Sequence, residues 1–143
     1  MTVPDGLSGM ESMDAATDPE RFRRAIAGLS SEVDPLDLAD LLESFLDDNR
    51  VRMGSLSGLL EAGDRPALAR CAHAIRGSAA IFGLQDLVRS AAALESAAGL
   101  PVPPGLPGLI DALRRHWERM EPLMRAVHAE MVSRKAAAGR PTA

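Results

Sequence analysis

The sequence predicts an all-α fold: an up-down-up-down four-helix bundle with a short additional N-terminal helix. The chain has 143 residues, of which 46% are hydrophobic, 25% charged and 3% aromatic, and this length suffices to bury one core without disulfides or metal. Leu, Ala, Arg and Glu outnumber Val, Ile and Thr, which favours helix over strand. Four longer segments with helical apolar spacing are joined by short connections, as is typical of a bundle.

The first expected element is a short helix. Residues 1–16 mix Gly, Ser, Met and acidic residues without periodicity, so we expect a mobile N-terminal segment. Thr17 and Asp18 offer capping side chains directly before a Pro, a combination typical of a helix start. The helix is predicted to span about 19–29.

The second predicted helix is long. Asp34 and the Pro after it repeat this start signal, and an apolar stripe at three-to-four spacing continues to about Ala62. Gly54 and Gly58 lie one turn apart inside the helix, so we expect a bend or a close helix contact there. The stripe consists of Leu38, Leu41, Leu42, Phe45, Leu46, Met53, Leu56, Leu59 and Leu60.

Two shorter helices follow. Asp64 is a cap for the third helix, which is predicted to end near Phe82, and the fourth ends near Gly99. Residues 100–108 are rich in Pro and Gly, so they form a connection that stops one helix and directs the next.

The last predicted helix begins near Leu109 and carries a stripe rich in Leu and Met. Pro122 predicts a kink within it. The chain end lacks an apolar stripe, so we expect a mobile tail over residues 134–143. The folded domain is therefore expected to span residues 17–133.

The net charge of −4 hides an asymmetry between the two parts of the chain. Residues 1–64 carry 14 acidic and 5 basic side chains, whereas residues 65–143 carry 6 acidic and 11 basic ones. The basic part has one Lys and few aromatic residues, so it fits nucleic-acid binding poorly. It suits a protein partner with a local acidic site.

Other classes are disfavoured by the composition. One Cys, Cys71, excludes an internal disulfide, and no apolar run reaches the roughly 18 residues of a membrane span. The sequence shows no signal peptide, so a cytoplasmic location is expected. His116 and His128 are too far apart to share a metal, and we expect no metal site. Without a Gly-rich phosphate loop, autonomous kinase activity is not expected.

The third helix places His73 at the centre of its outward face. At about 100° per residue, Arg70 and Arg76 fall roughly 60° to either side of it. Small residues surround the imidazole on this face, namely Ala69, Gly77 and Ala80. Cys71 falls on the opposite, core-facing side, together with Leu68, Ile75, Ser78, Ala79 and Phe82.

A solvated surface histidine is the simplest interpretation of His73, and two neighbours argue against it. Gly77 costs about 1 kcal/mol relative to Ala within a helix, and on an exposed face no core packing offsets this cost. Its missing side chain opens the flank of the imidazole to another surface. Arg76 is placed to reach an anion on the ring. These features fit a transient phosphoryl acceptor.

The stretch AHAIRGSAAIFGL, residues 72–84, resembles the signature of histidine-containing phosphotransfer (HPt) domains. In that family an Ala-His pair precedes a Lys-Gly-Ser run, and a Gly closes the helix. Residues 41–46 and Leu94-Glu95 also match the family pattern, and the resemblance covers about residues 34–133. It implies a four-helix bundle and a phosphorelay role with His73 phosphorylated. Arg76 stands where the family more often has Lys.

The resemblance also implies a polar group on the neighbouring helix that orients the imidazole. Glu95 matches this position, and a carboxylate there would keep the proton on one ring nitrogen while the other is phosphorylated. Gln85, just past the Gly83 turn, is the alternative. The sequence leaves both open.

The expected function is that of a free-standing, monomeric phosphorelay intermediate. A receiver-domain aspartyl phosphate would dock over Ala69, Arg70, Arg76, Gly77 and Ala80, and neutral His73 would attack phosphorus in line. The receiver would supply the Mg²⁺, so the chain needs no cofactor of its own. Hybrid histidine kinases and response regulators are the expected partners. Steering towards their acidic pocket is assigned to Arg65, Arg70, Arg76 and Arg89.

Three alternatives belong to other classes. A helical adaptor could bind receivers or kinases without carrying phosphate. A bundle could instead bind a metal or small ligand in its core, although the apolar stripes offer few polar groups for this. A dimeric kinase core would require a nucleotide-binding region, and Ala74 stands where an acid after the histidine could act as base.

Overall fold

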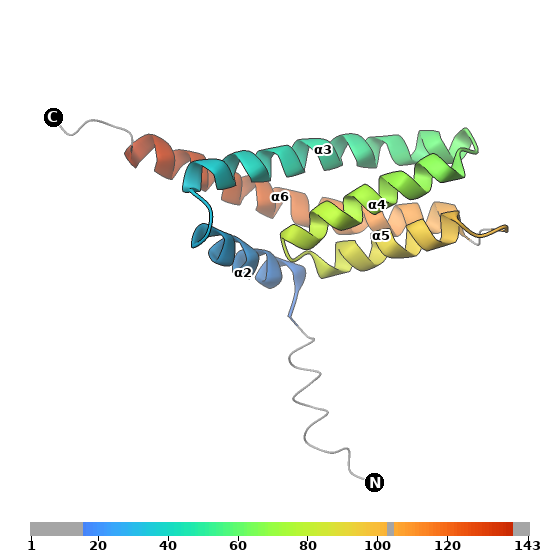
Figure 1. Cartoon of the computed structure of the whole chain (residues 1–143), viewed down its shortest axis with the longest axis horizontal. Helices are drawn as coiled ribbons and strands as arrows, with labels where there is room; N and C mark the ends of the chain where they lie inside the picture. Colours follow the sequence, from blue (N-terminus) through green and yellow to red (C-terminus); the bar gives the residue numbers. More distant parts are fainter. Residues whose placement is uncertain (1–15, 103–104, 139–143) are drawn as a thin grey trace, which may run out of the picture.

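The computed structural model describes residues 16–102 and 105–138, which contain five helices and no strand. The all-α prediction is confirmed for this part of the chain. Figure 1 shows α2 beside one end of a bundle of longer helices. The helices are α2 (Asp18–Ser30), α3 (Pro35–Glu61), α4 (Arg65–Ile81), α5 (Gln85–Ala98) and α6 (Leu106–Ala138).

The predicted capping residues begin the helices. The Asp34 carboxylate accepts a hydrogen bond from Leu36 N at 3.0 Å, and Asp64 accepts one from Ala67 N at 3.1 Å. Each satisfies a backbone donor that the first turn of a helix leaves unpaired. The turn after α3 contains Gly63, whose φ is positive. Glycine adopts this left-handed conformation readily, because it has no side chain to clash with the backbone.

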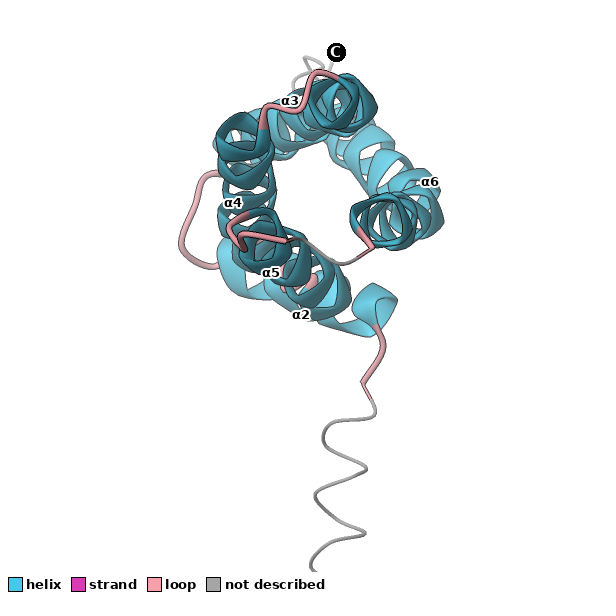
Figure 2. Ribbon diagram, turned by 90° about the vertical axis from the view of Figure 1, so that its right-hand side faces the viewer, coloured by secondary structure: helices cyan, strands magenta, loops and turns pink. Residues whose placement is uncertain are grey.

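The four longer helices enclose the core. Figure 2, which looks along the helices, shows α4 between α3 and α5, with α6 completing the ring. Leu, Ile, Met and small Ala side chains fill the centre. Phe82 lies 4.7 Å from Phe45 and 6.2 Å from Phe22, centroid to centroid, and Trp117 lies 5.8 Å from Phe45. This aromatic chain links α2, α3 and α6 to the end of α4.

Helix α2 is attached to the turn between α4 and α5. The N-cap position of α5 is Leu84, which has no capping side chain, and the buried Asp18 of α2 instead accepts a hydrogen bond from Asp86 N at 3.2 Å. Arg21 donates to the same Asp18 carboxylate at 3.1 Å. A side chain on one helix therefore caps the start of another.

Gly83 is required in this turn for two reasons. Its φ of 69° disfavours a side chain, and a Cβ at this position would lie 2.8 Å from the backbone oxygen of Arg21. Gly63 has nearly the same φ, 68°, but a Cβ there would meet nothing within 4 Å. Gly63 is therefore favoured by its backbone conformation alone, whereas Gly83 is also required by the close approach of the Arg21 backbone.

Some details differ from the sequence predictions. No atom lies within 4 Å of a Cβ built at Gly54 or Gly58, so of the two alternatives predicted for these residues, a bend or a close helix contact, the contact is wrong. Both glycines face solvent on α3. Helix α6 continues through Pro122 and past residue 133 to Ala138. The remainder of the predicted tail, and residues 1–15 of the predicted N-terminal segment, lie outside the described residues.

Gly83→Ala should therefore destabilise the fold more than Gly63→Ala. We expect Gly63→Ala to lower the free energy of unfolding by about 1–2 kcal/mol, the cost of a left-handed residue with a Cβ. Gly83→Ala should add at least about 1 kcal/mol for displacing α2 from the turn. Urea denaturation followed by circular dichroism measures both, and equal losses would contradict the close approach of Arg21.

Candidate functional site

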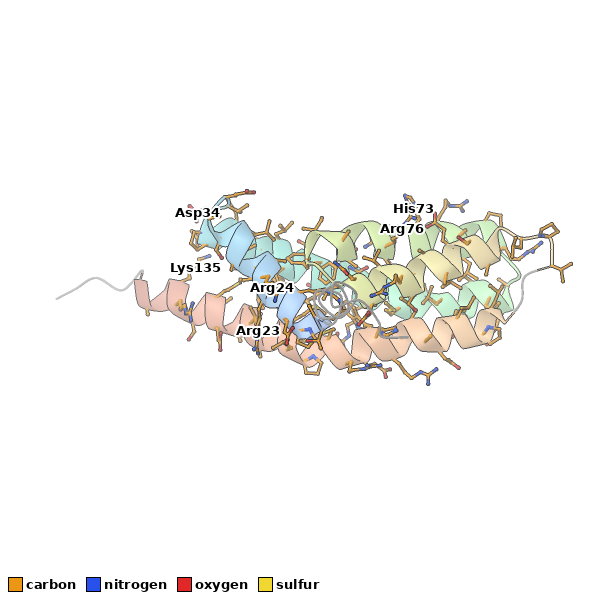
Figure 3. The ribbon with its side chains drawn as sticks, turned by 90° about the horizontal axis from the view of Figure 1, so that it is seen from below. Arg23, Arg24, Asp34, His73, Arg76 and Lys135 are labelled. Atoms are coloured by element: carbon orange, nitrogen blue, oxygen red, sulfur yellow. The ribbon has the colours of Figure 1, made fainter. Side chains whose placement is uncertain are left out.

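His73 lies on the outer face of α4, where its side chain is 63% exposed. Figure 3 shows His73 and Arg76 projecting away from the bundle on the same side. The opposite face of α4 is buried in the core through Leu68, Ala72, Ile75 and Ala79. The outward position of His73 that helical spacing predicts is therefore the one in the structure.

Glu95 on α5 contacts the imidazole directly. Its Oε1 lies 2.8 Å from Nδ1 of His73, although the two residues are 22 positions apart in the sequence. Arg76 completes the cluster, with Nη2 3.0 Å from the same Nδ1 and Nε 3.3 Å from Oε2 of Glu95. Oε2 is buried and accepts no hydrogen bond from the described residues, so the Arg76 ion pair is its compensation.

Nδ1 of His73 cannot bond to both neighbours at once. A carboxylate only accepts hydrogen bonds and a guanidinium only donates them. With the proton on Nδ1, the ring donates to Glu95 in the shorter, charge-assisted contact. In this tautomer Nε2 carries no proton, so its lone pair is available, as a nucleophilic nitrogen requires. Arg76 is then held by the Glu95 carboxylate rather than by the ring.

Small side chains surround the imidazole. A Cβ built at Gly77 would meet nothing within 4 Å, so this position opens to solvent. Ala80 is exposed, and Ala69 is half-buried. Arg70 is exposed and forms no ion pair within the described part of the chain. The face therefore has one cation without a charged partner and few bulky groups.

Two of the arginines assigned to partner steering lie elsewhere. Arg65 Nη1 donates to the backbone oxygen of Leu100 at 2.5 Å, so its guanidinium is committed to the turn after α5. Arg89 pairs with Asp86 at 3.1 Å and borders a pocket that it shares with residues of α2 and α6. The structure does not bring either arginine into the cluster around His73.

Gln85, the alternative orienting residue, is not near the imidazole. It is the first residue of α5 and is exposed, whereas Glu95 lies about 15 Å further along the same helix. Of the two side chains, only Glu95 is in contact with His73.

A buried polar pair beneath the site was not predicted. Asn49 of α3 is fully buried, and its Nδ2 donates to Ser78 Oγ of α4 at 3.0 Å and to Phe45 O at 2.9 Å. The pair joins the two helices at a fixed rotation and so helps to set the direction of the His73 face. An Asn within the apolar stripe of α3 is the signal in the sequence that could have revealed it.

Cys71 lies in the interface between α4 and α3. Its thiol donates to Arg52 O at 3.6 Å. Burial raises the pKa of Cys71, and the nearby Arg52 charge opposes this only in part. The thiol is therefore protonated at neutral pH and is a poor nucleophile.

Neither a metal nor a membrane helix is indicated by residues 16–102 and 105–138. They contain no group of three His, Cys, Asp or Glu side chains that could hold a metal ion. No helix among them is long and apolar enough to cross a membrane.

Residues 40–122, more than half of the chain, match the family profile of the Hpt domain. The chain belongs to the Hpt domain family. Hpt domains are phosphocarriers of two-component signalling, and the matched region of this one includes His73, Arg76 and Glu95. No curated protein and no solved structure matches the chain.

The Asn49–Ser78 pair of the Hpt domain should be energetically coupled. We expect Asn49→Ala to lower the free energy of unfolding by about 1–3 kcal/mol, because it removes a buried hydrogen-bond partner. In a double-mutant cycle with Ser78→Ala, the coupling should be about 1 kcal/mol. Ser55→Ala is the control, since among residues 16–102 and 105–138 the Ser55 hydroxyl bonds only to Val51 O of its own helix. Additive effects of Asn49→Ala and Ser78→Ala would disprove the coupling.

Proposed function

We propose that this Hpt domain is a phosphorelay intermediate. It accepts a phosphoryl group on His73 from the aspartyl phosphate of a receiver domain, and passes it to, or back to, another receiver. The observation that carries the proposal is the contact of Glu95 with Nδ1 at 2.8 Å on an exposed imidazole, because this contact leaves Nε2 free to react. The four longer helices, as an up-down-up-down bundle, would hold the two residues together.

The transfer step requires no added base. The Nε2 lone pair attacks phosphorus in line, the bond from phosphorus to the aspartate oxygen breaks, and that oxygen leaves as a carboxylate. The Nδ1 proton stays on the ring, hydrogen-bonded to Glu95. The ring gains positive charge as the N–P bond forms, and the Glu95 carboxylate stabilises this charge. The reverse sequence returns the group to a second aspartate.

Arg76 would neutralise the phosphoryl oxygens. In the free protein its guanidinium lies on the Nδ1 side of the ring, so it must turn towards Nε2 to reach the phosphoryl group. Its Nε contact with Glu95 keeps it beside the site meanwhile. An Arg has a planar fork of donors, so it can contact both the carboxylate and a phosphoryl oxygen, whereas a Lys presents a single charge.

A receiver domain supplies what the site lacks. Its acidic pocket would carry the Mg²⁺ that neutralises the phosphoryl group, and this Hpt domain would need no cofactor of its own. Receivers of response regulators and of hybrid histidine kinases are the proposed partners. They would approach over Ala69, Gly77 and Ala80, where small side chains allow close contact, and Arg70 would face the acidic pocket.

Label transfer tests this function. Incubation with a radiolabelled phospho-receiver should place an acid-labile, base-stable label on the protein, and His73→Gln should abolish it. His128→Gln, on α6, is the control and should be labelled normally. Label that persists in His73→Gln, or no label with any receiver of the same cell, would exclude the proposal. A phosphate-free adaptor would instead signal normally with His73→Gln.

The role of Glu95 predicts a slower transfer in its absence. Glu95→Ala removes the carboxylate that stabilises the charge developing on the ring, and a loss of about 1.5–3 kcal/mol from the transition state would lower the transfer rate by about 10–150-fold. Gln85→Ala should leave the rate unchanged, because Gln85 lies far from the ring. Rapid-quench measurement of label transfer compares the two. Equal rates for Glu95→Ala and the unaltered protein would show that the contact does not contribute to transfer.

A further inference from the structure

Two exposed apolar side chains follow α5 directly. Leu100 is 46% exposed and Val102 is 85% exposed. The turn that carries them is anchored, because Arg65 of α4 donates to the backbone oxygens of Leu100 at 2.5 Å and of Pro101 at 3.4 Å. We refer to residues 100–102 as the apolar ledge. Leu100, Pro101 and Val102 are three consecutive exposed apolar residues, and exposed apolar residues that form a contiguous patch mark interaction sites.

The apolar ledge borders the face that carries His73. A pocket of about 290 Å³ lies between the ledge and the start of α4. Ala69, one turn before His73, contributes to its wall, so the pocket opens beside the site. The other lining residues are Arg65, Pro66, Ala98, Gly99, Leu100 and Pro101.

We propose that the apolar ledge is a second contact for the partner receiver domain and determines which receivers the protein serves. This inference rests on the proposed phosphotransfer at His73. The partner surface that fits the ledge is an apolar patch beside the acidic pocket of the receiver. Arg65 is a positioning residue here, because it holds the turn and does not itself face the partner's charge.

The dimensions of a protein complex support this assignment. A specific interface covers about 800 Å² on each partner, equivalent to a disc of roughly 16 Å radius. Arg65, to which the ledge is bonded, lies about 12 Å along α4 from His73. A receiver centred on His73 therefore covers the start of α4, to which the ledge is bonded. Besides His73, Arg70 and Arg76, this face offers only small side chains, so larger apolar contacts must come from its edge.

The uncharged ledge and the charged Arg70 should contribute to receiver binding in different ways. The Arg65 guanidinium is already bonded to backbone oxygens, and Leu100 and Val102 are uncharged. Their contribution to binding should therefore vary little with salt, whereas electrostatic steering by Arg70 should weaken as salt rises. Selection among receivers, all of which have an acidic pocket, would then depend on the apolar contact.

Two phosphoryl donors of different size distinguish a docking role of the ledge from a role in the transfer reaction itself. Phosphoramidate is small and needs no docking surface: its phosphoryl group moves to Nε2 of His73 and ammonia leaves. A phospho-receiver must dock first. Val102→Asp should raise the receiver concentration for half-maximal transfer by about 10-fold and leave the saturating rate and the phosphoramidate labelling unchanged. Leu100→Ser is a second variant, with the same expected direction.

The matched control is Val132→Asp. Val132 is also an exposed valine, 44% accessible, but it lies near the end of α6 and should leave receiver dependence unaltered. Arg65→Ala should resemble Val102→Asp, because it releases the turn. In both variants, the transfer rates from several receivers of the same cell should become more similar to one another.

The outcomes distinguish the two proposals. If neither donor labels His73, the phosphotransfer function itself is wrong. If phosphoramidate and receivers both label His73 and Val102→Asp and Leu100→Ser leave receiver dependence and discrimination unchanged, the ledge has no role in recognition and this inference fails.

Discussion

The tight turn at Gly83 fixes the register between α4 and α5, and the site depends on this register. His73 and Glu95 lie on opposite sides of the turn, about 15 and 18 Å from it along two adjacent helices, so their side chains meet. Helix α2 covers the turn through the Arg21 backbone and the Asp18 carboxylate. A shift of one residue in this turn would rotate Glu95 by about 100° and remove it from the imidazole.

Apolar and polar contacts have separate tasks in this fold. The core of Leu, Phe and Ala side chains brings the helices together, but such packing tolerates small rotations of each helix. The directional contacts remove that freedom: Asn49 to Ser78 between α3 and α4, and Asp18 to Asp86 between α2 and α5. Each buried polar group would be costly without its partner, which favours one arrangement over its neighbours.

Local signals in the sequence predicted most of the fold. Asp34 and Asp64 mark helix starts because a cap acts within one turn, and helical spacing gives the outward direction of His73. The spacing could not decide between Glu95 and Gln85, because the register across a turn depends on tertiary packing. The contacts of Arg65 could not be predicted either, since its partners are backbone oxygens, which the sequence does not display.

The glycines and the chain end show the same limit. Gly54 and Gly83 are the same residue type, yet Gly54 faces solvent and Gly83 faces the backbone of α2. At the end of α6, Ala, Arg and Lys are strong helix formers, so the helix continues to Ala138 without an apolar stripe. Intrinsic propensity prevailed there over the absence of a packing signal.

The cap that Asp18 provides has a consequence for how this protein can be divided. The region shared with the Hpt family begins at residue 40, after α2 and the first turn of α3. A fragment cut at that boundary would leave the amide of Asp86 without its acceptor and would expose the Phe82 ring that Phe22 covers. The packed unit is therefore larger than the matched region, and its additional N-terminal helix packs against the hairpin that carries His73.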